Sequence, residues 1–390
     1  MTGAAAARNV VVLGSTGSVG SQALSVVRSM GGRVRVVGLS GGSRWRDLAA
    51  QAREFGVEAV SVADREDALR LRDALDGCGT EVLWGAEGLR RLAGWGGADV
   101  VLSAVSGGVG LPAAVAALEA GKTLALANKE AMVMFGPALM ALAREGGGAI
   151  LPVDSEHSAL FQLLRSVPPE EVARIVLTAS GGPFRGMTRS ELTRVTAEDA
   201  LRHPTWQMGR KITVDSATLM NKALEIIEAR WLFGLPADRI GVVIHPQSVV
   251  HCLVELVDGS VLAHMGAPDM RLPIQYALSY PERTAGPVER LDLARLGGLE
   301  FCEPDFATFP ALALGYRVAR EGGTSGAVLS AANEVAVAAF LNGEVSLPGV
   351  VDVVEDVMDR HSVEPAAGLA AVMAADRWAR EEAQSCLHRP

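Results

Sequence analysis

The chain has 390 residues, of which 49% are hydrophobic and 21% are charged. This length exceeds what one hydrophobic core usually supports, so two or three packed units are expected, and the composition excludes a disordered or fibrous protein. The net charge of −9 would repel nucleic acids and anionic membranes. A ligand that carries phosphate must therefore meet a local cluster of donor groups.

The cysteines and the apolar runs indicate the compartment. The four cysteines lie far apart and form no CxxC pair, which argues against a disulfide framework and against a thiolate zinc site. The stretch before Val10 lacks the apolar core of a signal peptide, and no apolar run reaches the ~20 residues that a bilayer requires. We expect a cytoplasmic protein with neither a membrane nor a nucleic acid as partner.

Residues 9–152 alternate short β-branched runs with helical patterns, which is typical of βαβ units around a parallel sheet. The expected strands are Val10 to Leu13, Val34 to Leu39, Ala59 to Val62, Val100 to Ser103 and Thr123 to Ala127. The predicted fold class is α/β, with a Rossmann-like doubly wound parallel sheet in a first domain of residues 1–153.

A glycine-rich turn follows the first expected strand. The strand leads into Gly14-Ser15-Thr16-Gly17-Ser18-Val19-Gly20 and then into a helical pattern from Ser21 to Met30. Glycines let the backbone approach a pyrophosphate, and the helix N-terminus offers free N–H groups to its charge. The spacing is GxxGxxG rather than GxGxxG, and a plain strand-to-helix turn is the alternative. The βαβ frame favours a dinucleotide site.

The end of the second strand distinguishes NAD from NADP, because an Asp or Glu there binds the ribose 2′-hydroxyl of NAD. The chain has Ser40-Gly41-Gly42-Ser43-Arg44 at this place, without a carboxylate. The hydroxyl of Ser43 and the planar guanidinium of Arg44 suit a 2′-phosphate. Gly42, Ser43 and Arg44 are therefore predicted to bind NADPH; the alternative is that Arg44 is a solvated residue at a helix start.

A second, α+β domain is expected over residues 154–268, with strands from Arg174 to Thr178, Val242 to His245 and Val249 to Val257. It opens with Asp154 and Glu156, which would share one side of an extended chain. The alternative for this pair is a turn with a helix cap.

Residues 180–211 form a long loop within this domain, which is typical of a lid or binding segment. The loop contains His203 and Trp206, and Gly181, Gly182 and Gly209 near its ends provide the permissive backbone of a hinge. We predict a flap that closes over a ligand; the alternative for Trp206 is a place in the core.

A long helix is expected from the capping residue Ser216 to Gly234. On it Asn221, Lys222 and Glu225 lie three and four residues apart and share a face. The alternative is a solvated pair of Lys222 and Glu225 that stabilises the helix by about 0.3 kcal/mol. That account does not explain why a polar trio interrupts an apolar helix.

If Glu225 meets Asp154 and Glu156, the three carboxylates require a cation. Ligation by oxygen alone selects Mg²⁺ or Mn²⁺ over zinc or copper. An isolated histidine after two acids is more often structural, so His157 is not counted as a ligand.

The end of the chain is expected to be helical. Residues 269–305 are rich in proline and are predicted to be a linker, followed by a small C-terminal helical domain of residues 306–390. The expected helices are Phe309 to Glu321, Ser330 to Leu341, Val350 to His361 and Gly368 to Cys386.

These motifs occur in the order found in one family, and over residues 9–342 the chain resembles 1-deoxy-D-xylulose 5-phosphate reductoisomerases. The segments that carry the resemblance are Gly14 to Gly20, Leu126-Ala127-Asn128-Lys129-Glu130, Leu151 to His157, Ser180 to Phe184, His203 to Lys211, Val214 to Leu232, His245-Pro246-Gln247-Ser248 and Ala331-Ala332-Asn333-Glu334. One departure concerns the second strand, after which relatives carry Lys-Asn where this chain has Ser43-Arg44.

The resemblance implies a role for each matching residue. It implies that the metal ligands are Asp154, Glu156 and Glu225, and that the substrate phosphate is bound by Ser180, Ser216, Asn221 and Lys222. It implies that Lys129 and Ser155 contact the substrate near the metal, that His203 and Trp206 close over it, and that Lys129, Glu156 and Glu225 are catalytic. The NADPH site would be lined by Thr16, Gly17, Ser18, Val19, Asn128, Glu130 and Gly209.

By the same resemblance, the expected reaction converts 1-deoxy-D-xylulose 5-phosphate into 2-C-methyl-D-erythritol 4-phosphate, and the expected assembly is a homodimer. The metal would act as a Lewis acid during the rearrangement, and NADPH would supply hydride. Two alternatives stay open: an NADP-dependent dehydrogenase of the semialdehyde or homoserine type, and a non-catalytic NADP-sensing module. Neither alternative needs a carboxylate trio or phosphate-binding serines.

Overall fold

The computed structural model describes residues 7–206 and 208–388 and divides the chain into two compact units. Unit one consists of Met1–Asn128, Ala138–Ser158 and Asp269–Glu289, and unit two of Lys129–Pro137, Ala159–Pro268 and Arg290–Pro390. The chain thus passes between the units several times, twice within a helix. The domain boundaries expected from the sequence stay a prediction.

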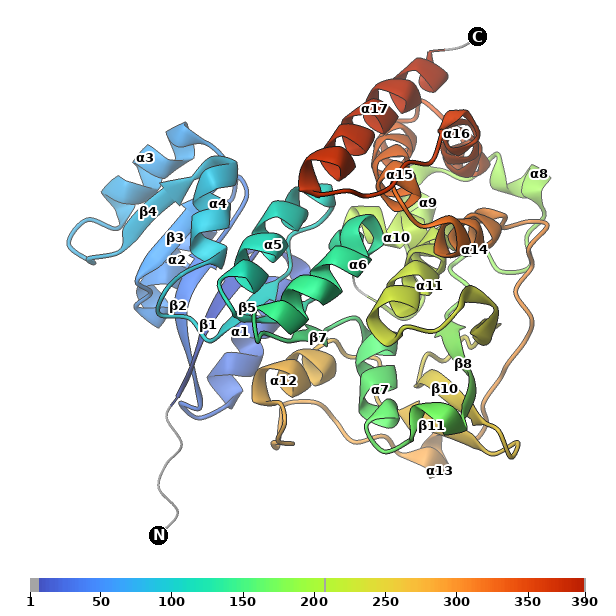
Figure 1. The fold of residues 1–390 in the computed structure, drawn as a ribbon, viewed down its shortest axis with the longest axis horizontal. Helices are drawn as coiled ribbons and strands as arrows, with labels where there is room; N and C mark the ends of the chain where they lie inside the picture. Colours follow the sequence, from blue (N-terminus) through green and yellow to red (C-terminus); the bar gives the residue numbers. More distant parts are fainter. Residues whose placement is uncertain (1–6, 207, 389–390) are drawn as a thin grey trace. The chain divides into compact units, whose positions relative to one another are not determined.

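Unit one is built on a parallel sheet with the strand order β4-β3-β2-β1-β5-β6-β7 (Figure 1). The strands are β1 (Arg8–Leu13), β2 (Val34–Ser40), β3 (Ala59–Val62), β4 (Glu81–Trp84), β5 (Val100–Ser103), β6 (Thr123–Leu126) and β7 (Ile150–Pro152). The inner strands are near-continuous Val and Leu runs because helices bury both faces of such a sheet. The strand order reverses between β1 and β5, which confirms the predicted doubly wound class.

The helices of unit one lie on the two faces of this sheet. They are α1 (Ser18–Ser29), α2 (Trp45–Phe55), α3 (Arg65–Ala74), α4 (Gly85–Ala93), α5 (Leu111–Glu119) after the short η1 (Gly108–Gly110), and α12 (Arg271–Ser279). Right-handed crossovers place α1 to α3 on the face opposite to α4 and α5, because the chain changes direction after β4. Helix α2 packs on α3, α4 on α5 and α12 on α1.

Helix α12 lies in the segment that was expected to be a linker. Its residues Ile274, Ala277 and Leu278 are buried, and the helix packs on α1 and β6. The expectation of a linker was therefore wrong for residues 271–279. Prolines disguise the helix in the sequence, although Pro273 stands in its first turn, where a missing N–H costs no hydrogen bond.

Two helices belong to both units. Helix α6 (Lys129–Glu145) is kinked at Phe135, two residues before Pro137, and helix α7 (Ser155–Leu164) continues from its first turn in unit one into unit two. Ser158 donates its backbone N–H to the carbonyl of Asp154, which places Asp154 at the start of α7. The extended conformation considered for Asp154 and Glu156 was therefore wrong, and the alternative of a helix start is correct.

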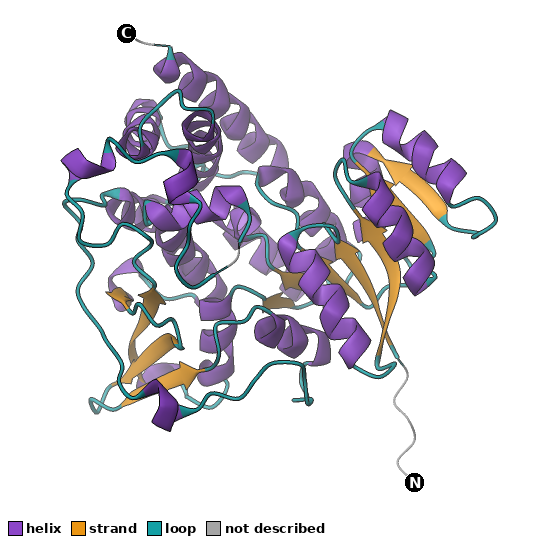
Figure 2. Cartoon of the chain, turned by 180° about the vertical axis from the view of Figure 1, so that it is seen from behind, coloured by secondary structure: helices purple, strands orange, loops and turns teal. Residues whose placement is uncertain are grey.

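Unit two contains a four-stranded mixed sheet, within the described residues, in the order β11-β10-β8-β9 (Figure 2). Its strands are β8 (Val172–Ala179), β9 (Ile240–Ile244), β10 (Val250–Leu256) and β11 (Val261–Met265), of which β11 was not expected from the sequence. Strands β8 and β9 are parallel, and β10 is antiparallel to both β8 and β11.

The remaining helices all lie in unit two. They are η2 (Pro169–Glu171), α8 (Arg189–Leu192), α9 (Ala197–Ala200), α10 (Arg210–Ala217), α11 (Met220–Phe233), η3 (Ala237–Arg239), α13 (Leu293–Leu296), α14 (Ala311–Glu321), α15 (Ser325–Leu341), α16 (Leu347–Arg360) and α17 (Leu369–Leu387). The four helices expected at the end of the chain are confirmed as α14 to α17. Helix α15 packs on α16, α17, α14 and α10, so its small residues are buried almost all round. None of the described helices has both the length and the apolar character needed to cross a membrane.

The expectation of one long helix that begins at Ser216 was wrong. Helix α10 ends at Ala217 and α11 begins at Met220, so Ser216 lies in the last turn of α10. The break occurs at Leu219, which adopts a left-handed conformation with φ 60°. The hydroxyl of Thr218 bonds back to the carbonyls of Val214 and Asp215 and helps to close α10.

Candidate functional site

In unit one, the glycine-rich turn joins β1 to α1. A Cβ at Gly20 would lie 2.2 Å from the carbonyl oxygen of Gly14, and a Cβ at Gly14 would lie 2.5 Å from that of Ala104. Ser40, at the end of β2, holds the turn, since its hydroxyl accepts the N–H of Gly14 at 2.9 Å. Helix α1 begins after Gly17, and no described side chain caps it. The close approach of turn and helix is the geometry that exposes N–H groups to an anion.

Further predicted cofactor residues lie at the same edge of the sheet. Thr16 is buried, and Ser18 and Val19 stand in the first turn of α1. Gly42, Ser43 and Arg44 follow β2 and are exposed, and the segment from Ser40 to Arg44 holds no carboxylate. Asn128 follows β6, is buried, and donates its side-chain N–H to the carbonyl of Gly107 at 3.1 Å. The carboxyl ends of β1, β2, β5 and β6 thus meet where open α/β sheets bind nucleotides.

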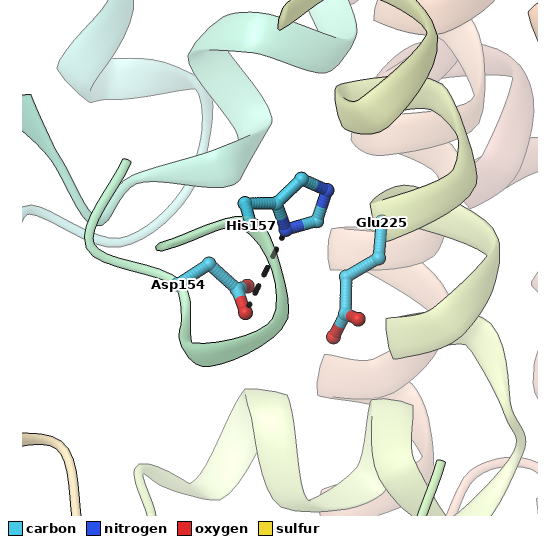
Figure 3. A group of neighbouring side chains, drawn as sticks. All are labelled: Asp154, His157 and Glu225. Carbon is cyan, nitrogen blue, oxygen red and sulfur yellow. Dashed lines mark ion pairs between the residues drawn. The ribbon is translucent and has the colours of Figure 1, made fainter. Parts of the chain in front are cut away.

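The acidic turn at the start of α7 completes the part of the site that lies in unit one. Asp154 and His157 are buried, with 3.8 Å between the Asp154 Oδ1 and His157 Nδ1 atoms. The Ser155 hydroxyl donates a short hydrogen bond to the carboxylate of Glu156, and both residues are partly exposed. Figure 3 draws Asp154 and His157, with a dashed line for their ion pair, and Glu225 of α11. His157, which the sequence analysis did not count as a ligand, thus lies beside Asp154 within unit one.

In unit two, two lysines surround Glu225, which is 1% exposed. The Lys129 ammonium lies 2.7 Å from the Asn221 side-chain oxygen and 3.1 Å from Glu225 Oε1. The Lys222 ammonium donates to the other oxygen, Oε2, and the amide of Asn221 donates to Oε1 at 2.5 Å. The pair of Lys222 and Glu225 is therefore buried rather than solvated, and the alternative of a surface ion pair is wrong.

This cluster brings α6 and α11 together at their first turns. Both ammonium groups are at least nine-tenths buried, so they lack bulk water and take their charge compensation from the protein. The ammonium groups of Lys129 and Lys222 are donors that can also bind an anion such as phosphate.

A second buried cluster was missed by the sequence analysis. The Lys211 ammonium on α10 lies 2.9 Å from the Glu130 carboxylate and 2.8 Å from that of Asp215. Burial lowers the pKa of Lys211, but the two carboxylates outweigh this effect and hold the pKa above its ordinary value. Burial conversely raises the pKa of Glu130, and the charge and hydrogen bond of Lys211 bring it below the usual range. Lys211 stands in the first turn of α10, and the sequence analysis, which placed it at the end of a loop, did not predict these partners.

His203 joins the flap to the body of unit two. Its Nε2 atom lies 3.1 Å from the Ser180 hydroxyl and 3.1 Å from the Ser216 hydroxyl. Its Nδ1 atom accepts the backbone N–H groups of Thr205 and Trp206. Because Nδ1 is an acceptor, the neutral ring carries its proton on Nε2. Burial lowers the pKa of His203, which favours this neutral form.

The flap itself is partly ordered by short helices α8 and α9, each with a capping box. Gly181 and Gly182 have φ angles of 84° and 68°, and a Cβ at Gly182 would lie 2.7 Å from the Ser216 carbonyl oxygen. Trp206 is half-buried, and Gly209 caps the start of α10. The neighbouring Gln207 lies outside the described residues. The structure thus brings Ser180, His203 and Ser216 together, as expected, while hinge motion stays a prediction.

The two units together define a class of protein: a dinucleotide-binding α/β enzyme that carries a second unit with a buried cluster of lysines, carboxylates and hydroxyl groups. Three family models match the chain. They are the 1-deoxy-D-xylulose 5-phosphate reductoisomerase model at residues 10–136, its C-terminal domain model at 150–233 and the DXP reductoisomerase C-terminal domain model at 265–382.

Full-length relatives agree with these matches. The chain is 53% identical over 381 residues to the 1-deoxy-D-xylulose 5-phosphate reductoisomerase of Symbiobacterium thermophilum, with 97% of this chain and 98% of the relative covered. It is 52% identical to that of Pelotomaculum thermopropionicum, with 96% and 97% covered. The chain belongs to the 1-deoxy-D-xylulose 5-phosphate reductoisomerase family.

Solved structures share the fold. The reductoisomerase of Zymomonas mobilis in complex with NADPH is 41% identical, with a TM-score of 0.91 and 98% and 100% of the two chains covered. A DOX-P reductoisomerase in complex with NADPH, fosmidomycin and magnesium is 38% identical, with a TM-score of 0.92 and 97% and 98% covered.

Proposed function

We propose that the chain converts 1-deoxy-D-xylulose 5-phosphate into 2-C-methyl-D-erythritol 4-phosphate, with NADPH as reductant and Mg²⁺ or Mn²⁺ as metal. The observation that carries the proposal is the buried cluster of Lys129, Asn221, Lys222 and Glu225 in a chain of this family. A plain dehydrogenase of the semialdehyde or homoserine type needs no such cluster. When bound, NADPH supplies the hydride that reduces the rearranged carbon skeleton.

The nucleotide is proposed to bind at the carboxyl edge of the parallel sheet. Support comes from the close approach of Gly14 and Gly20, which a side chain would block. Thr16 to Val19 would meet the pyrophosphate, and Gly42, Ser43 and Arg44 the 2′-phosphate, since no carboxylate stands there to repel it. Asn128, Glu130 and Gly209 would line the nicotinamide end.

The metal is proposed to bind to Asp154, Glu156 and Glu225. The donor chemistry fits, because carboxylate oxygens are the ligands that Mg²⁺ and Mn²⁺ prefer; Asp154 and Glu225 are buried and Glu156 is partly exposed. When bound, the metal acts as a Lewis acid on the ketone and a neighbouring hydroxyl during the rearrangement.

The substrate phosphate is proposed to bind to Ser180, Ser216, Asn221 and Lys222. The serine hydroxyls already lie on either side of the His203 Nε2 atom, so three donors converge on one place. Phosphate binding far from the reacting carbons would order the flap, with Trp206 over the substrate, and exclude water from the intermediate.

Near the reacting carbons, Ser155 is proposed to contact the substrate, and the Lys129 ammonium lies 3.1 Å from Glu225 Oε1. The Lys129 ammonium can donate a hydrogen bond to a substrate oxygen as negative charge develops there. Its burial makes this interaction stronger than it would be in water. We further propose that the enzyme is a homodimer in the cytoplasm, which sedimentation of the purified protein and fractionation of cells would test.

The experiment is to mix the purified chain with NADPH, Mg²⁺ or Mn²⁺ and 1-deoxy-D-xylulose 5-phosphate and to follow the NADPH absorbance. We expect NADPH oxidation that requires all three partners and stops when a chelator is added, with 2-C-methyl-D-erythritol 4-phosphate as the product. Turnover that persists without a divalent metal would favour the dehydrogenase alternative. NADPH binding without any substrate-dependent oxidation would favour the sensing module.

A further inference from the structure

The motif Ala331-Ala332-Asn333-Glu334 on α15 has no role in the site described so far. Its asparagine nevertheless starts a chain of polar contacts that reaches the first turn of α6. The Asn333 amide donates to Asp215 Oδ1 at 2.8 Å, Lys211 binds Asp215 Oδ2 at 2.8 Å, and the same ammonium binds Glu130 at 2.9 Å. All four residues belong to unit two.

The two carboxylates and the amide in this series of contacts are buried, and Lys211 is partly buried. Asn333 is 0% exposed, Asp215 is 1% exposed and Glu130 is 7% exposed. A carboxylate removed from water must have its oxygens satisfied by donors, and Asn333 and Lys211 supply one donor to each oxygen of Asp215. The loss of either donor leaves a charged oxygen in an environment that solvates it poorly. The chain of contacts therefore fixes the positions of its members more strictly than surface ion pairs would.

The two ends of this series of polar contacts adjoin residues of the proposed site. Asp215 precedes Ser216 on α10, and the Ser216 hydroxyl shares His203 with Ser180. Glu130 follows Lys129 at the start of α6, and the Lys129 ammonium binds Glu225. Lys211 stands between them, one helical turn before Asp215. The Lys211 side chain thus connects α10, which bears the proposed phosphate-binding residue Ser216, with α6, which bears the proposed catalytic residue Lys129.

We propose that Asn333 and Lys211 are positioning residues for the substrate and cofactor sites. Asn333 orients Asp215 and with it the Ser216 turn of α10, whereas Lys211 aligns that turn with the Lys129–Glu130 end of α6. This inference rests on the proposed function, because Ser216 is taken to bind the substrate phosphate and Glu130 to line NADPH.

The different contacts of the two residues predict different effects. Asn333→Leu removes the amide and keeps a side chain of similar volume, so we expect the KM for 1-deoxy-D-xylulose 5-phosphate to rise about tenfold, the loss typical of a hydrogen bond to a buried charge. The Kd for NADPH, measured by fluorescence, should change less than about twofold in this variant. Lys211→Met should weaken both, and Lys211→Arg should restore part of each because a guanidinium can also bridge two carboxylates.

A matched control is available on the same helix. Glu334, the next residue, binds Arg380 on α17 at 2.8 Å, and Arg380 also binds Asp376. Arg380→Met breaks a partly buried ion pair between α15 and α17, and Arg380 is not a residue of the proposed site. It should lower the Tm and leave the KM and Kd at wild-type values.

The outcomes distinguish a failure of the proposed function from a failure of the positioning role. A wild-type chain that does not turn over the substrate refutes the proposed function. An active wild type together with a lower Tm but an unchanged KM in Asn333→Leu refutes the positioning role and makes Asn333 a purely structural residue. If Asn333→Leu does not fold, Asn333→Ser gives the same decision, since it shortens the side chain and withdraws the donor from Asp215. Equal changes of KM in Asn333→Leu and Arg380→Met would also overturn the proposal.

Discussion

Glu225→Gln tests the centre of the proposed site. Glutamine keeps the shape of the side chain and one acceptor oxygen but removes the charge. Glu225 compensates two buried ammonium groups, those of Lys129 and Lys222. Removal of one partner of a buried ion pair costs about 3–5 kcal/mol, so the substitution should lower stability measurably.

Glu225→Gln should also lower the rate of turnover. The variant loses a proposed metal ligand and the group that orients the Lys129 ammonium, and a loss of about 4 kcal/mol of transition-state stabilisation corresponds to roughly a thousandfold lower kcat. NADPH should still bind to unit one with a nearly unchanged Kd. The assay is NADPH oxidation in a metal-buffered solution, with NADPH affinity measured separately by fluorescence.

The matched control is Glu228→Gln, which removes a second carboxylate buried on the same helix α11. Glu228 is not one of the proposed metal ligands. If Glu225→Gln retained turnover within about tenfold of the wild type, a loss of only about 1.4 kcal/mol, or if the two variants lost it equally, the assignment of Glu225 as a ligand would be wrong.

Three further expectations concern other parts of the site. Gly20→Ala should weaken NADPH binding at least tenfold, about 1.4 kcal/mol, because the new Cβ would lie 2.2 Å from the Gly14 carbonyl oxygen. The control Gly96→Ala should not change the Kd, because nothing lies within 4 Å of the new Cβ. Equal Kd values for the two variants would disprove the role of the close approach. Trp206→Ala should raise the KM for the substrate, and an unchanged KM would remove the flap from substrate binding. Since burial depresses the pKa of His203 below its ordinary 6.5, the neutral ring favours the folded state, so its contribution is complete above pH 6.5 and is lost as the pH falls below it. Lowering the pH from about 7 to about 5 should therefore reduce the Tm of the wild type more than the Tm of His203→Gln. Thermal unfolding at several pH values measures this, and parallel pH profiles of the two Tm values would contradict the reasoning.

Local patterns predicted much of unit one and the helices at the end of the chain. The strands of the parallel sheet are short apolar runs, and the turn from Gly14 to Gly20 follows one of them directly, so both are readable from neighbouring residues. The break between α10 and α11 was not readable, because a leucine at φ 60° has no signature in the sequence. Helix α12 was concealed by prolines that suit its first turn and the chain after it.

The site was predicted in part for a similar reason. Asn221, Lys222 and Glu225 were found because they recur at helical spacing on one face. The contacts of Lys211 with Glu130 and of Asp215 with Asn333 join residues 81 and 118 positions apart, and no periodic pattern links such residues. Pairings of this kind depend on how the helices of unit two pack.

The interleaving of the two units limits how the gene can be shortened. A fragment that stops at Asn128 would contain the glycine-rich turn, yet it would lack β7, whose backbone pairs with Leu124 to Leu126 of β6. It would also lack α12, which covers α1 from a part of the chain some 250 residues away. An open strand edge beside an uncovered apolar helix is a template for self-association. A nucleotide-binding fragment obtained by simple truncation should therefore aggregate, and one that stays monomeric would have to retain Ala138–Ser158 and Asp269–Glu289 as well.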